Sequence, residues 1–290
     1  MPIPKLTIIG EAINDSVPST HKFYEANDIA ALKELAASQD TGGASYIDIN
    51  VGPRPGAFLA EMVRQVQSVT TKPLSIDTPD PEMAEAGLKA YDRARAGGQI
   101  PILNSVSPLR VKMFELTRIM PFMPILLASE RVENGAGQPN HTAEEVHQTA
   151  RQLVQEAARH GIPADQCIID PAIAPIGADS EGRFRCLMGA LRLIQADPSL
   201  KSVHLSVGLS NFTVMIPPKR ADGSPTKGPL ENAFLTLAMP LGLDHVIGSV
   251  KRKYELLPPD HPALVCLNDC LKLEGFDVIM RVQEYYASRG

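Results

Sequence analysis

Acidic and carboxamide side chains stand at the ends of six short apolar segments in this 290-residue sequence. Any one of these residues could simply cap the helix that follows it, because Asp and Asn are favoured at such positions. Six apolar segments that all end in acceptors or amides indicate a shared site instead. In chain order the residues are Glu11 with Asn14, Asp48 with Asn50, Asp77, Asn104, Asp170, and Ser210 with Asn211.

The segment Ile47-Asp48-Ile49-Asn50 carries a pattern that local capping does not explain. Side chains two positions apart in a β-strand project from the same face, so Asp48 and Asn50 would face the same space. Asp48 taken alone keeps a second interpretation, as a cap between a strand and the next helix.

The residue types at these positions exclude several chemistries and leave two. They offer no Lys for a Schiff base and no His or Cys for zinc, and the chain has no GxSxG nucleophile motif. A planar heterocycle with adjacent N–H donors, such as the 2-amino and N3–H edge of a pterin, fits because a carboxylate can accept both donors. A divalent cation is the competing fit, since hard cations also bind oxygen.

Eight apolar segments alternate with amphipathic helical patterns along the chain. Buried parallel strands read as continuous apolar runs, and alternating strands and helices predict a parallel sheet. Eight such units in about 250 residues favour a closed α/β barrel, the (β/α)8 TIM barrel, whose active site lies at the carboxyl ends of its strands. No GxGxxG motif follows the first strand, which disfavours a dinucleotide-binding sheet. The segments are residues 6–9, 46–49, 74–76, 100–103, 125–128, 168–169, 203–209 and 245–247.

Helix boundaries can be read from capping residues. Asp28 is expected to cap one helix, Thr142 begins a capping box, and Ser180 is expected to open a further helix. The long irregular stretch at residues 215–229 predicts a functional or disordered loop. No linker divides the sequence, so we expect a single domain over residues 1–290.

Composition and charge argue against several partners and locations. With a net charge of −5, no Trp and no Lys/Arg run longer than three residues, the chain is not expected to bind nucleic acid. No apolar stretch reaches the length of a membrane span, and the first residues lack the apolar region of a signal peptide. The four cysteines form no CxxC pair and suit buried thiols. We therefore expect the reducing cytoplasm.

Six segments, taken in order, resemble the pterin-binding barrel of the methyltetrahydrofolate:corrinoid protein methyltransferases. A similar barrel forms a module of cobalamin-dependent methionine synthase. Each motif is short, but six in register are specific, and the resemblance covers essentially the whole chain. The segments are IIGEAIN at 8–14, YIDINVGP at 46–53, LSID at 74–77, ILNS at 102–105, IDP at 169–171 and GLSN at 208–211.

The resemblance implies a role for each polar position. Asp77, Asn104 and Asp170 would bind the pterin ring, the carboxylates accepting from its amino and imino edge. Asn211 would lie beside N5 and help the methyl group leave, so that Asn211 and Asp77 are the expected catalytic residues. The supporting positions would be Gly208 and Ser210, shaping the pocket by backbone contact, and Glu11, Asp48 and Asn50 as a second layer and floor.

The implied function is exchange of the N5-methyl group between methyltetrahydrofolate and the cobalt of a corrinoid, in either direction. This would serve an O-demethylase or a one-carbon pathway. Tetrahydrofolate or its 5-methyl form is the expected substrate, and a partner corrinoid protein would supply the cobalt corrinoid. No metal is expected in the chain itself, and the resemblance also implies a homodimer.

Three alternatives remain open. Dihydropteroate synthase shares the barrel and the pterin pocket, but its relatives carry Ser-Arg-Lys after the seventh strand, where this chain has Ser210-Asn211-Phe212. A non-catalytic pterin-binding module and a metal-dependent barrel lyase are the others. Methyltransferase relatives also carry an Arg near the site, after the Gly-Leu-Ser-Asn segment. Here the cations that follow are Lys219, Arg220 and Lys227, which could meet the folate tail, the corrinoid partner or only solvent.

Overall fold

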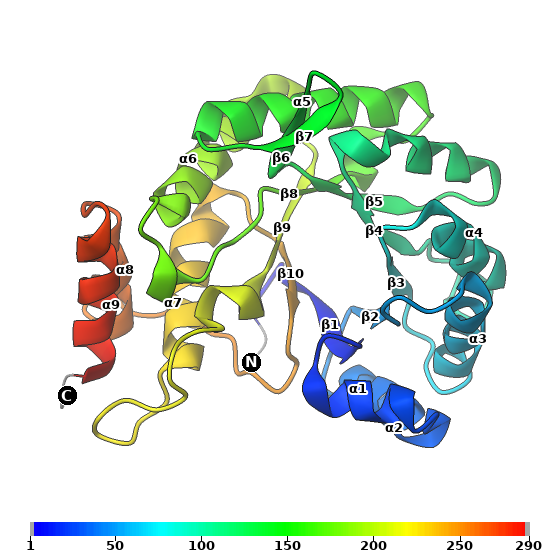
Figure 1. Cartoon of the computed structure of the whole chain (residues 1–290), viewed down its shortest axis with the longest axis horizontal. Coiled ribbons are helices and arrows are strands. Elements are labelled where there is room, and N and C mark those ends of the chain that lie inside the picture. Colours follow the sequence, from blue (N-terminus) through cyan, green and yellow to red (C-terminus); the bar gives the residue numbers. More distant parts are fainter. Residues whose placement is uncertain (1–2, 288–290) are drawn as a thin grey trace.

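Eight parallel strands close into a barrel with helices around it (Figure 1), in a computed structural model that describes residues 3–287. The strand order around the barrel is β1-β10-β9-β8-β5-β4-β3-β2. Each apolar segment identified in the sequence forms one of these strands, so the predicted TIM barrel is confirmed. The strands are β1 Thr7–Asn14, β2 Tyr46–Asn50, β3 Leu74–Asp77, β4 Ile102–Val106, β5 Met123–Leu127, β8 Ile168–Asp170, β9 His204–Gly208 and β10 His245–Gly248.

Helices follow the strands and cover the outside of the barrel (Figure 1). Between β4 and β5 the connection is a 3-10 segment, η1 Pro108–Arg118, in place of a regular α-helix. The α-helices are α1 Pro18–Glu25, α2 Ile29–Thr41, α3 Gly56–Gln67, α4 Pro81–Ala90, α5 Ala143–Arg159, α6 Arg183–Ala196, α7 Lys227–Ala238, α8 Pro262–Cys270 and α9 Phe276–Ala287.

The helix caps follow the sequence signals with one exception. Asp28 caps α2, and Thr142 forms the predicted capping box at the start of α5. The prediction that Ser180 opens the next helix is wrong. That helix, α6, begins at Arg183, and the carboxylate of Asp179 accepts hydrogen bonds from its first two backbone N–H groups at 2.7 and 2.8 Å.

The first strand is longer than its apolar run, and this changes the position of Glu11. Strand β1 continues to Asn14, so Glu11 lies within the strand. The pairing of β1 with β2 shifts between Gly10 and Ile13, which makes an irregularity of the bulge type. Such bulges re-aim side chains and are common beside active sites.

Side chains fill the interior of the barrel up to the carboxyl ends of its strands. Four isoleucines, Ile9, Ile102, Ile125 and Ile168, come from β1, β4, β5 and β8 and are at most 1% exposed. Such interdigitated layers make the interior of a TIM barrel a packed core. Space for a ligand is therefore confined to the carboxyl ends of the strands.

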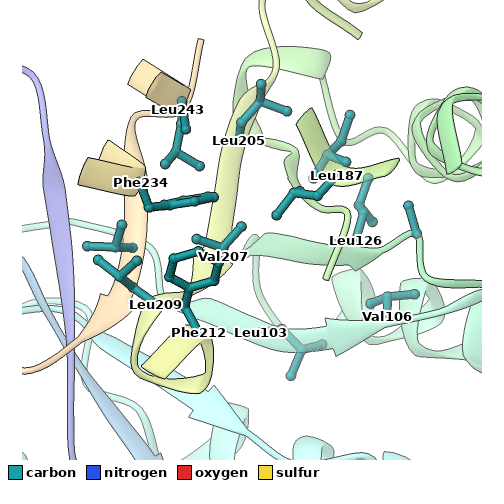
Figure 2. Packing of buried hydrophobic residues seen from close by; sticks show 14 of the residues in the cluster. Leu103, Val106, Leu126, Leu187, Leu205, Val207, Leu209, Phe212, Phe234 and Leu243 are labelled. Atoms are coloured by element: carbon teal, nitrogen blue, oxygen red, sulfur yellow. The ribbon is translucent and has the colours of Figure 1, made fainter. Parts of the chain in front are cut away.

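A second core lies between the strands and the helices, and it fixes the segment after β9 (Figure 2). This segment is the 3-10 turn η5 Leu209–Thr213. The buried ring of Phe212 packs against Phe234 of α7 and Phe184 of α6, with ring centroids 5.2 and 5.5 Å apart. The apolar face of α6, with Phe184, Leu187, Met188 and Leu191, is thus part of the core.

A two-stranded hairpin, β6 Glu130–Glu133 and β7 Ala136–Pro139, follows β5 and was not predicted. Its turn is Asn134-Gly135, and both residues have positive φ, +52° and +79°. This pair is the sequence signature of a tight hairpin turn, so the signal was present in the sequence.

The irregular stretch predicted at residues 215–229 is shorter than expected, because α7 already begins at Lys227. One antiparallel bridge, between Lys219 and Pro225, ties the loop to itself. The four cysteines are free, and Cys167, Cys266 and Cys270 are buried. Within the described part of the chain, we find no helix whose length and apolar character would let it cross a membrane.

Candidate active site

A cavity of ≈ 710 Å³ opens at the carboxyl ends of the barrel strands. Its size lies within the range of small-molecule sites, roughly 300–1,000 Å³. Eight of the nine site residues expected from the sequence line it, and the ninth, Asn50, lies behind Asp77 and contacts it. The eight lining residues are Glu11, Asp48, Asp77, Asn104, Asp170, Gly208, Ser210 and Asn211.

Asn50 holds the carboxylate of Asp77 in place. Its side-chain Nδ2 donates to Asp77 Oδ2 at 2.9 Å, while its own Oδ1 accepts from the backbone N–H of Gly52 at 2.9 Å. Burial raises the pKa of Asp77, and the hydrogen bond from Asn50 and the positive charge of Arg110 lower it less. The carboxylate of Asp77 therefore has a fixed orientation at the edge of the cavity.

Asp48 is a buried acid next to Asp77. It lies in the middle of β2 and is 1% exposed, so the interpretation as a helix cap is wrong. Burial, and then the negative charge of Asp77, raise its pKa well above the usual range, while Ser75 and Asn104 oppose this shift. A buried acid beside a second carboxylate favours its neutral form. Neutral Asp48 can then donate a hydrogen bond to Asp77.

Asp170 ends β8 and faces the same cavity. Burial raises its pKa to about 7, although the backbone N–H of Ala172 donates to its Oδ1 at 2.7 Å. Ala172 also lines the cavity and has φ +66°, a left-handed conformation that is uncommon for a residue with a side chain. Strained backbone of this kind clusters at functional sites.

Asn211 stands exposed at the mouth of the cavity, on the turn η5. The two residues that follow it hold the turn firmly: Phe212 is buried in the aromatic cluster, and Thr213 Oγ1 donates to Glu231 Oε1 at 2.7 Å. A methyl group added at Gly208 would lie only 2.8 Å from Asn211 Nδ2. The glycine thus leaves room for the amide of Asn211.

Ser210 joins this turn to β1 through its side chain. Its hydroxyl donates to Glu11 Oε2 at 2.8 Å. Burial raises the pKa of Glu11, opposed by the Ser210 hydroxyl and by Arg252. Arg252 also forms an ion pair with buried Glu231, with Nε 3.2 Å from Oε2. Glu11 and Ser210 also line a second cavity of ≈ 200 Å³, next to the first.

Several cavity residues were missed by the sequence analysis. The end of the fifth strand received no role, yet Leu127 lines the cavity, as do Ser105, Ile173 and Val214. Apolar side chains on the wall suit the flat faces of an aromatic ring. The position of Leu127 could have been inferred, because every strand of a barrel reaches the same rim. Ser105 lies in β4 where its pairing with β5 shifts, and Ile173 and Val214 lie on irregular backbone, for which the sequence gives no periodic signal.

The three loop cations lie outside the lining of this cavity. Arg220 is held by α9: its Nε donates to the carbonyl oxygen of Tyr285 at 3.1 Å, and its guanidinium lies 4.8 Å from the centroid of the Tyr285 ring. Lys227 Nζ is 3.5 Å from the carbonyl oxygen of Val214. The cations that act on the acids of the cavity are instead Arg110 for Asp77 and Arg252 for Glu11. Arg110 also donates to Ser105 Oγ at 3.3 Å.

The cavity favours a heterocycle with N–H donors over a metal ion. Among the described residues, its carboxylates do not bring three ligand atoms within 4.8 Å of one another. Asp77 and Asp170 both have raised pKa values because burial is not matched by donors. A ligand that supplies N–H donors would satisfy both carboxylates.

Comparison with known proteins agrees with this geometry. A family described as pterin binding enzyme matches residues 12–248. The methylcorrinoid:tetrahydrofolate methyltransferase of Eubacterium limosum is 28% identical over 248 residues, 83% of this chain and 84% of that protein.

Solved structures of dihydropteroate synthases share the fold. The 7,8-dihydropteroate synthase of Vibrio fischeri ES114 has a TM-score of 0.57 at 16% identity, covering 83% of this chain and 86% of that one. The Xanthomonas albilineans enzyme, with 4-aminobenzoic acid, has a TM-score of 0.55 at 20% identity, covering 92% and 90%. At such identities the likeness concerns the fold alone.

Proposed function

The chain belongs to the family of pterin binding enzymes, and on this premise we propose that it transfers a methyl group between a corrinoid and N5 of tetrahydrofolate. The observation that carries the proposal is one cavity lined by Asp77, Asn104, Asp170 and Asn211. The name of the Eubacterium limosum relative supports the same reaction.

The acids and Asn104 are proposed to bind the pterin ring. A carboxylate accepts two adjacent N–H donors, and its charge strengthens both hydrogen bonds. Asp77 and Asp170 face the cavity, and the orientation of Asp77 is set by Asn50 before any ligand arrives. Preorganisation of this kind lowers the cost of binding. Glu11, Asp48 and Asn50 would support these residues from below.

Asn211 is proposed to act at N5. Methylation of tetrahydrofolate forms the N5–carbon bond, breaks the carbon–cobalt bond and releases the N5 proton. In the reverse direction N5 must leave with its electron pair, and positive charge or a hydrogen bond at N5 lowers that barrier. The amide of Asn211 can accept from N5–H or donate to N5, whereas an ionised carboxylate cannot donate.

The exposed position of Asn211 suits this role. Its side chain makes no hydrogen bond to other described residues, while the backbone of η5 is fixed by Phe212 and Thr213. The amide can therefore turn without loss of an existing contact. Asp77 shares the catalytic role by holding the ring in register with Asn211.

The corrinoid would be a substrate carried by a partner protein, and the name of the relative suggests transfer from methylcorrinoid to tetrahydrofolate. The proposal also includes a cytoplasmic location and a homodimer. Two large apolar side chains on α9, Phe276 and Met280, are 76% and 52% exposed and are candidates for a subunit contact. Light scattering on the purified protein tests the dimer.

The dihydropteroate synthase alternative is disfavoured by Phe212. Relatives of that enzyme carry Ser-Arg-Lys at the corresponding positions, so that a cation stands where this chain has Phe212. Here the residue after Asn211 is an aromatic side chain with no exposed surface. No cation can occupy this position without disrupting the contacts with Phe184 and Phe234.

The experiment is a methyl-transfer assay with tetrahydrofolate and methylcobalamin, run in both directions. Wild-type protein is expected to form 5-methyltetrahydrofolate. Asn211→Ala should slow the transfer by about 100-fold, the lower end of the usual contribution of general acid–base groups, with little change in folate binding. Asn268→Ala on α8 is the control and should react as wild type. An inactive wild-type protein, or an Asn211→Ala variant with an unchanged rate, would contradict the proposal.

A further inference from the structure

The amino ends of the strands carry a second cluster of potential ligand residues, far from the cavity along the barrel. His204 is the first residue of β9, and His245 is the first residue of β10. Asp244 immediately precedes β10. Because β9 and β10 are neighbours in the barrel, the three side chains meet. We call His204, Asp244 and His245 the basal cluster.

Both imidazoles face the same carboxylate. His204 Nδ1 lies 2.6 Å from Asp244 Oδ2, and His245 Nδ1 lies 2.8 Å from Asp244 Oδ1. One ligand atom from each residue lies within 4.8 Å of the others. His245 is buried, while the side chains of His204 and Asp244 are each 31% exposed. Solvent ions can therefore reach the cluster.

The ring of His204 has an acceptor on each side. Besides the contact of Nδ1 with Asp244, its ring donates to the backbone carbonyl of Asp165. A neutral imidazole has one N–H group. With that group on Asp165, the lone pair of Nδ1 would face a carboxylate oxygen, which is repulsive. This repulsion is removed by the tautomer with its proton on Nδ1, by a second proton, or by a metal ion bound between the two atoms.

We propose that the basal cluster binds one divalent transition-metal ion, with Zn²⁺ as the best match. Imidazole nitrogen and carboxylate oxygen are normal zinc ligands, at about 2.0–2.2 Å. Nδ1 of His204, Nδ1 of His245 and one oxygen of Asp244 would supply three ligands. The hydrogen bond to Asp165 would hold the His204 ring in the metal-binding tautomer, as carbonyl partners of ligating histidines do.

The fourth ligand would be water, because the side chains of His204 and Asp244 are partly exposed. Tetrahedral zinc requires its ligand atoms to lie about 3.3 Å apart, given the bond lengths above. The two contacts of 2.6 and 2.8 Å must therefore widen by about half an ångström, which small side-chain rotations supply. The ion would fasten β9 to β10 at the end of the barrel that serves stability.

The test is isothermal titration of chelator-treated full-length protein with ZnCl₂, at neutral pH and without folate. Wild type is expected to bind one Zn²⁺ per chain and to unfold at a higher temperature with the ion. His204→Gln and His245→Gln should each weaken binding by more than the about 10- to 100-fold caused by loss of an outer partner.

The matched control is His147→Gln. His147 Nε2 lies 2.8 Å from Asp197 Oδ2 in a pair that has one histidine only, and the variant should bind Zn²⁺ as wild type does. If a cluster variant fails to fold, Asp244→Asn replaces it, and the Zn²⁺-dependent rise in unfolding temperature of wild type still decides. Absence of one-to-one binding by wild type would show that a second proton fills the position. Equal binding by the cluster variants and wild type would overturn the assignment.

Discussion

At the carboxyl ends of the strands, Asp77 and Asp170 are buried with few donors, whereas at the amino ends Asp244 accepts from two imidazoles and a backbone N–H group. Burial raises the pKa of Asp170 to about 7. Burial also acts on Asp244, but the hydrogen bonds from His204 and His245 outweigh it and hold the pKa of Asp244 well below its usual range.

The difference separates a carboxylate that supports the fold from one that awaits a ligand. A buried charge without enough partners lowers the stability of the free protein. Such a cost persists where function requires the group. Removal of the carboxylate should therefore change stability in opposite directions at the two ends.

The largest expected effect is at the amino end. Asp244→Ala leaves both imidazoles and the N–H of Leu205 without their acceptor. We expect the free energy of unfolding to fall by about 3 kcal/mol, since hydrogen bonds to charged groups contribute roughly 1.5–3 kcal/mol each and this group is partly exposed. Urea unfolding of metal-free protein measures it. A loss below about 0.5 kcal/mol, typical of surface substitutions, would remove the contrast.

The opposite change, a gain in the free energy of unfolding, is expected for Asp170→Asn. The raised pKa means that the folded state disfavours the ionised form of Asp170. Ionisation therefore costs no stability below the pKa of Asp170 in the unfolded chain, and its full cost is present above pH 7. An amide cannot ionise and still accepts from the N–H of Ala172. The variant should be more stable than wild type at pH 8 and equal to it near pH 4. Destabilisation at pH 8 would show that the charge is compensated.

Folate binding should depend on pH through the same acid. The ionised carboxylate accepts both N–H donors of the pterin edge, so affinity should fall as pH drops below the pKa of about 7. Between pH 8 and pH 6 we expect about a tenfold loss, which follows from the ionised fraction. Fluorescence titration at several pH values measures it. In Asp170→Asn this dependence should be much weaker; an unchanged profile would assign it to another group.

The smallest effect is expected for Gly208→Ala. The backbone φ of −75° at Gly208 suits alanine, so the fold is not strained. The added methyl group would displace the amide of Asn211, which lies 2.8 Å from its position. We expect the methyl-transfer rate to fall by about fivefold with folate affinity nearly unchanged, because misplacement acts on the reacting geometry. A loss of affinity without a loss of rate would place Asn211 in binding only.

The sequence was sufficient for the barrel because each strand is buried on both faces and reads as an apolar run. It was also sufficient to select residues that meet in one cavity, since all strands of a barrel end at one rim. The two polar residues of Ile47-Asp48-Ile49-Asn50 do share the inner face: Asp48 lines the cavity and Asn50 contacts Asp77.

Features that depend on irregular backbone were not predicted. The register shift at Gly10 places Glu11 against Ser210, which is 199 residues away in sequence. Arg110 reaches the acids from a 3-10 segment that has no amphipathic period. The basal cluster also escaped notice, because its histidines are distant in sequence and meet only through the pairing of β9 with β10.

The most direct measurement is calorimetric titration of tetrahydrofolate into wild type, Asp77→Asn and the control Asp197→Asn, whose carboxylate lies outside the cavity, at pH 8. One site per chain is expected in wild type and in the control. Affinity should fall about 100-fold in Asp77→Asn, because two charge-assisted hydrogen bonds are lost. If Asp77→Asn binds as tightly as wild type, or wild type does not bind, the cavity does not recognise a pterin through its acids.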